Sequence, residues 1–90
     1  MYKPLKFDNI KEFTWTRIAK ELSRMTGTRI ELSESSGTVT FSEEGIDIRR
    51  SYNEPSQKLS LNCTRKPDNM GYDKIYDRLR EIVQSKIVTL

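Results

Sequence analysis

Four short runs of alternating apolar and polar residues, all within residues 28–65, constrain the fold more than any other feature of this 90-residue sequence. Successive side chains of a strand point to opposite sides of a sheet, so such alternation predicts strands with one buried and one solvated face. The apolar members of the runs are Ile30 and Leu32, Val39 and Phe41, Ile46 and Ile48, and Leu59, Leu61 and Cys63.

Clusters of turn-forming residues separate the runs, at positions 35–37, 43–45 and 53–57. Glycine readily adopts the positive φ of a tight turn, and proline cannot donate a backbone hydrogen bond to a ladder. Links this short connect antiparallel neighbours, because a parallel crossover needs a dozen or more residues. We therefore expect a four-stranded antiparallel meander over residues 28–65.

Two amphipathic segments flank this predicted sheet. In residues 8–27 apolar side chains recur at helical spacing, with Asp8 as the candidate N-cap and Gly27 as the candidate C-cap. The same spacing predicts a second helix over residues 70–88, capped by Asp68 or Asn69.

Together these elements predict a single α+β domain over residues 1–90, with residues 1–7 as an N-terminal arm. The expected order is α-β-β-β-β-α, folded as a two-layer sandwich with both helices on one face of the sheet. Parity then predicts a second face that is hydroxyl-rich, mixed in charge and free of aromatic side chains. Its expected members are Arg29, Glu31, Ser33, Thr38, Thr40, Ser42, Asp47, Arg49, Ser51, Lys58, Ser60, Asn62 and Thr64.

The composition argues against an enzyme. Histidine is absent, which removes the commonest general base and the commonest metal ligand. A zinc site would need more than the single cysteine, and Cys63 has the inward parity of a small core residue rather than of a nucleophile. We therefore predict no catalytic, metal-binding or cofactor-binding residues and no small-molecule substrate.

The apolar runs and the cysteine count also indicate the cellular compartment. No run approaches the roughly 18 apolar residues of a membrane span, and the first residues lack the apolar region of a secretory signal. A lone cysteine cannot form an internal disulfide, so we expect a cytoplasmic protein without membrane contact. A domain of this size would also suit a regulator encoded by a phage or mobile element.

The net charge of +3 is unevenly distributed. Basic residues exceed acidic ones by six to three in residues 1–27 and by six to four in residues 63–90, whereas acids lead by six to four between them. Arg17, Lys20 and Arg24 share one edge of the first predicted helix. These basic residues predict either a solvated helix face or a surface that follows phosphates.

We predict a small non-enzymatic interaction or regulatory module that binds a protein partner or self-associates as a homodimer. The alternative is a nucleic-acid-binding protein that uses the basic residues of the first helix and those that precede the second. Tryptophan at position 15 fits a binding anchor, although a half-buried core position is commoner. The candidate partner-binding residues are Phe13, Trp15, Arg17, Lys20, Arg24, Arg49, Arg65 and Lys66.

Overall fold

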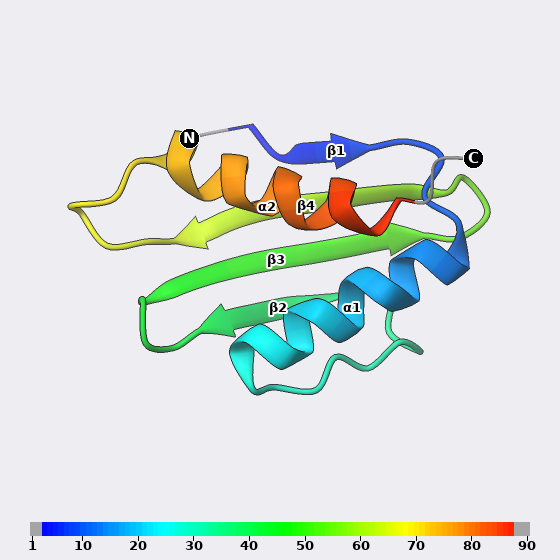
Figure 1. Ribbon diagram of the computed structural model, residues 1–90, viewed down its shortest axis with the longest axis horizontal. Coiled ribbons are helices and arrows are strands. Elements are labelled where there is room, and N and C mark those ends of the chain that lie inside the picture. Colours follow the sequence, from blue (N-terminus) through cyan, green and yellow to red (C-terminus); the bar gives the residue numbers. More distant parts are fainter. Residues whose placement is uncertain (1–2, 88–90) are drawn as a thin grey trace.

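The protein folds as a four-stranded antiparallel sheet covered on one face by two helices (Figure 1). The computed structural model describes residues 3–87. Along the chain the elements are β1 (Leu5–Phe7), α1 (Glu12–Thr26), β2 (Ser36–Phe41), β3 (Ile46–Asn53), β4 (Lys58–Arg65) and α2 (Tyr72–Lys86). The predicted α+β class, the four-stranded antiparallel sheet and the shared helix face are confirmed.

Strands β2, β3 and β4 form the predicted meander, and the spatial order of the sheet is β1-β4-β3-β2. Their inward side chains meet the apolar stripes of both helices in one continuous core, as the period-two and helical patterns require. The largest fully buried side chains are Ile10, Ile18, Leu22, Val39, Ile48, Leu59, Leu61 and Val83.

The fourth strand comes from the N-terminal arm and not from residues 29–34, so the order along the chain is β-α-β-β-β-α. Leu5 and Phe7 lie opposite Leu61 and Leu59 of β4 and pack against the core. Lys6, between them, points to solvent. The arm thus pairs the edge of β4 that would otherwise expose its backbone groups.

Residues 28–35 form a loop although their sequence alternates like a strand. Within it the Glu34 N–H donates to the Glu31 carbonyl at 3.1 Å, which closes a turn. The Arg50 guanidinium donates to the carbonyls of both residues, at 3.0 Å for Glu34 and 3.3 Å for Glu31. Arg50 thus takes the place of a ladder partner for these two carbonyls.

Both helices begin later than predicted. Lys11 is the N-cap of α1, because the chain first bends at Asp8 and Asn9, where Asn9 has φ 59°, and the Ile10 N–H then donates to the Gln57 carbonyl at 2.8 Å. Asp8 is therefore not the cap. Gly27 is the C-cap as predicted, with φ 71°.

Helix α2 has Gly71 as its N-cap, and neither Asp68 nor Asn69 has that role. The helix ends at Lys86 with Ile87 as its C-cap, and the predicted extension to position 88 lies outside the described residues.

Candidate functional site

The sheet face turned away from the helices is the broadest candidate surface, and we call it the open face. Its residues occupy the outward positions of all four strands, which are polar or charged throughout. They are Lys6, Ser36, Thr38, Thr40, Asp47, Arg49, Ser51, Asn53, Lys58, Ser60, Asn62, Thr64 and Arg65. Asn62 lies near the free edge of β4, where its Oδ1 accepts a hydrogen bond from the Tyr76 hydroxyl at 3.2 Å.

A β-bulge brings Arg65 onto the open face. Asp47 pairs with Arg65 and Ile48 pairs with Cys63, so Thr64 is an extra residue in β4 and Arg65 lies on the same side as Asp47. The Arg65 Nε lies 3.1 Å from the Asp47 Oδ2, and the Thr40 hydroxyl donates to the Asp47 Oδ1 at 2.8 Å. The only acid of the open face is therefore already neutralised and hydrogen-bonded.

The open face carries more positive charge than the predicted sheet face, because two cations join it. Lys6 joins it through β1 and Arg65 joins it through the bulge, whereas Arg29 and Glu31, of opposite charge, both leave it with the 28–35 loop. Four cations thus face one carboxylate. In residues 3–87, Lys6, Arg49 and Lys58 take part in no ion pair.

The three unpaired cations form a patch across β3, β4 and β1. Lys6 lies opposite Ser60, two positions along β4 from Lys58, and Arg49 lies opposite Asn62. From the spacing of strands and residues in a sheet, the Cα atom of Lys6 is about 8 Å from that of Lys58 and about 12 Å from that of Arg49. Such a patch spans about two to four phosphates of one nucleic-acid strand.

The basic residues predicted on the first helix lie on the opposite layer. Arg17, Lys20 and Arg24 are on the side of α1 away from its buried stripe. Arg24 pairs with Glu21 at 2.6 Å, and this hydrogen-bonded contact raises the pKa of Arg24. The Arg17 guanidinium lies 5.8 Å from the centre of the Phe13 ring. The structure therefore does not bring this row together with Arg49 or Arg65.

Three further residues were predicted to bind a partner, and two of them, Trp15 and Lys66, contact aromatic rings of the same chain. Trp15 is only 3% exposed and stacks on Tyr52 with ring centroids 5.5 Å apart, so it is a core residue and not an exposed anchor. Lys66 lies over the Tyr72 ring at 4.9 Å from its centre. Phe13, in contrast, is 68% exposed on α1.

Arg50 is buried on the helix side of the sheet, with an exposed fraction of 4%. Its guanidinium lies 5.8 Å from the Trp15 ring centre, and desolvation lowers the pKa of Arg50. To reach the 28–35 loop it passes Gly37, where a Cβ atom would lie only 3.1 Å from the Arg50 Nη2. Arg50 therefore holds the loop, and Gly37 provides the space for it.

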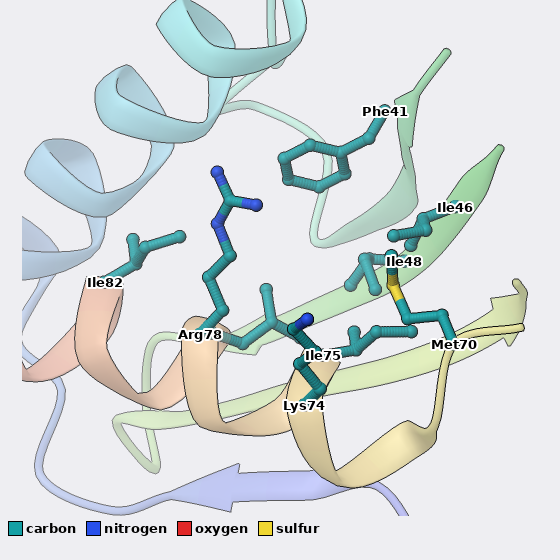
Figure 2. A pocket seen from close by; sticks show the side chains of 9 residues that line it. Phe41, Ile46, Ile48, Met70, Lys74, Ile75, Arg78 and Ile82 are labelled. Atoms are coloured by element: carbon teal, nitrogen blue, oxygen red, sulfur yellow. The ribbon is translucent and has the colours of Figure 1, made fainter. Parts of the chain in front are cut away.

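A small apolar pocket lies between α2 and the β2–β3 hairpin (Figure 2). Its volume is about 70 Å³. Arg78, on its rim, forms an ion pair with Glu44 of the hairpin at 3.5 Å. The lining residues are Phe41, Ile46, Ile48, Met70, Lys74, Ile75, Arg78, Leu79 and Ile82.

Reactive groups are not gathered anywhere in the described residues. No cluster of acids and cysteine in residues 3–87 has the geometry of a metal site. Burial raises the pKa of the Cys63 thiol, which is 6% exposed. Burial, with Glu54 and Glu12 nearby, also raises the pKa of Tyr52, whose hydroxyl donates to the Ile10 carbonyl at 2.6 Å. Cys63 and Tyr52 both belong to the hydrophobic core.

Neither described helix is long and apolar enough to cross a membrane. Comparison of the chain with protein-family models, with curated proteins and with solved structures finds no match.

Lys6 and Lys58 are open-face residues that the sequence-based list of partner-binding residues missed. The alternation of Leu5, Lys6 and Phe7 was an available signal for β1, although three residues are a short run. Parity did place Lys58 on the solvated face, but that face was expected to be mixed in charge, with Glu31 and Asp47 among its members.

Proposed function

We propose that this chain is a small non-enzymatic interaction module whose open face binds nucleic acid through the phosphate backbone. The observation that carries the proposal is the group of three unpaired cations, Lys6, Arg49 and Lys58, on a sheet face whose single acid is neutralised. The buried free thiol of Cys63 suits a reducing compartment, so we propose the cytoplasm as the location of the chain.

The chemistry of the open face favours a nucleic-acid backbone over a protein. Protein interfaces have an apolar centre, and no residue of the open face is apolar. Phosphate oxygens are bound by Arg and Lys together with the hydroxyls and amides of Ser, Thr and Asn. Those residue types make up the whole open face apart from Asp47.

The same composition predicts little sequence preference. Proteins that hold single strands usually stack bases on aromatic side chains, and the open face has none. Contacts to phosphates fix position without reading the bases. We therefore expect binding that depends strongly on salt and weakly on sequence.

Fluorescence anisotropy of short labelled oligonucleotides, single-stranded and duplex, tests the proposal. Three phosphate contacts predict a slope of log K against log salt of about −2 for single strands and about −3 for duplexes. Reversing the charges of the patch in Lys6→Glu, Arg49→Glu and Lys58→Glu together should abolish binding.

The matched control reverses three charges on the other layer, in Arg17→Glu, Lys20→Glu and Arg24→Glu. It changes the net charge equally and should bind far better than the open-face triple variant. Loss of binding only in the control would move the site to α1 and overturn the open-face proposal. Absence of binding by the wild-type chain at low salt would overturn nucleic-acid binding altogether.

A further inference from the structure

We propose that copies of this chain associate head to tail, with Leu32 of one copy seated in the apolar pocket of the next. The two surfaces are different from the open face and belong to the helix side and the end of the molecule. This proposal is therefore independent of nucleic-acid binding, and either can fail without the other.

The inserting group is an exposed leucine between acids. Leu32 is 48% exposed, and Glu31 and Glu34 are exposed on either side of it in the 28–35 loop. The carbonyls of both acids accept hydrogen bonds from the buried Arg50 guanidinium. The leucine is thus presented on a turn whose backbone is already ordered, which lowers the entropic cost of association.

The receiving group is the pocket between α2 and the β2–β3 hairpin. Its walls are apolar, and its charged lining residues are both cations, Lys74 and Arg78 (Figure 2). The volume of about 70 Å³ is roughly half of the ~150 Å³ cavity that holds benzene. That space suits about three aliphatic carbons, the number in the branched end of a leucine side chain.

The charges beside Leu32 and beside the pocket are complementary, and the two surfaces lie too far apart to meet within one chain. The acids beside Leu32 have the opposite sign to Lys74 and Arg78. The ion pairs of Arg78 with Glu44 and of Arg29 with Glu31, both at 3.5 Å, are exposed enough to exchange for pairs across the contact. Leu32 lies beside Asn53 and Glu54, at the end of β3, whereas the pocket is lined by Ile46, at the beginning of the same strand. A leucine therefore cannot enter the pocket of its own chain.

This geometry makes the contact heterologous. The inserting and receiving surfaces differ, so association continues from copy to copy instead of stopping at a symmetric dimer, unless a ring closes. One apolar side chain and exposed ion pairs form a small interface, which predicts a dissociation constant of about 1 mM.

Sedimentation velocity and NMR translational diffusion of the full chain over a concentration series test the proposal. The wild type should increase in average mass with concentration. Leu32→Asp, and separately the pair Lys74→Glu with Arg78→Glu, should weaken association at least tenfold. Phe13→Asp is the matched control, because Phe13 is a larger and more exposed apolar residue outside both surfaces, and it should associate like the wild type.

Mixing the two weakened variants gives the sharpest result. The Leu32→Asp chain keeps its pocket and the doubly substituted chain keeps its leucine, so the mixture should form one-to-one dimers that grow no further. Unchanged thermal unfolding shows that the exposed substitutions leave the fold intact. A wild type that stays monomeric, a mixture that stays monomeric, or equal weakening by Phe13→Asp would overturn the proposal.

Discussion

Replacing Arg50 by methionine tests whether one buried cation decides the conformation of the 28–35 loop. Arg50 donates to two carbonyls at 3.0 and 3.3 Å and lies over Trp15. Methionine retains an unbranched apolar side chain in the same space but has neither the charge nor the donors. We expect the fold to persist and the loop to lose its fixed backbone.

The expected change in the free energy of unfolding of Arg50→Met is the difference between stabilising and destabilising contributions of the guanidinium. Hydrogen bonds from a charged donor contribute about 1.5–3 kcal/mol each, and a cation over an aromatic ring adds about 0.5–2 kcal/mol. Burying the guanidinium costs several kcal/mol, which methionine avoids. The net loss in the free energy of unfolding should be about 2 kcal/mol, which lowers the melting temperature by roughly 8–16 °C for a chain of this size.

Two measurements separate the local from the global effect. Urea unfolding gives the stability, and amide hydrogen exchange reports the Glu34 N–H, which donates to the Glu31 carbonyl, and the Tyr52 N–H, which donates to the Ser35 carbonyl. Both amides should exchange faster in Arg50→Met, beyond what the loss of global stability explains.

Arg49→Met is the matched control, because Arg49 is the neighbouring residue and lies on the open face. Its effect on stability should stay within about 0.5 kcal/mol. If the two substitutions have equal effects, or if the Glu34 amide keeps its protection in Arg50→Met, then Arg50 does not hold the loop.

Two further predictions concern buried titratable groups. Burial raises the pKa of Tyr52 in the folded chain, so the unfolded chain loses the hydroxyl proton at a lower pH. The contribution of Tyr52 to the free energy of unfolding is therefore fully present below a pH of about 10 and decreases as the pH rises toward the folded pKa. Tyr52→Phe should reduce that alkaline slope in urea unfolding and cost about 1 kcal/mol at neutral pH through the lost bond to Ile10, whereas an unchanged slope would contradict this cause. The Cys63 thiol should react with iodoacetamide about tenfold or more slowly in the folded chain than in urea, and equal rates would show that it is accessible.

The sequence predicted the elements that local periodicity defines. Alternation at Val39, Ile48 and Leu61 located β2, β3 and β4, and helical spacing located α1 and α2. It failed for residues 29–34, which alternate as clearly as the true strands, and for β1, which is only three residues long. Parity also placed Arg50 inward, but periodicity could not show what its guanidinium would bind.

The candidate surfaces could be predicted from the sequence only in small part. The positive open face depends on the pairing of Lys6 with Ser60 and on the bulge that turns Arg65 toward Asp47. The apolar pocket requires α2 and the β2–β3 hairpin to meet, although the two are separated in sequence. Only Arg49 and Arg65 of the predicted partner-binding residues lie on the open face.

By itself, then, the sequence determined which segments have a buried side, because the period of the apolar residues reflects the local geometry of helix and strand. The tertiary structure decided which segment pairs with the edge of β4, which loop Arg50 holds and which charges share a face. Those outcomes depend on backbone hydrogen bonds and side-chain contacts between residues far apart in the chain. Such contacts do not affect the local periodicity of apolar residues, so they cannot be predicted from it.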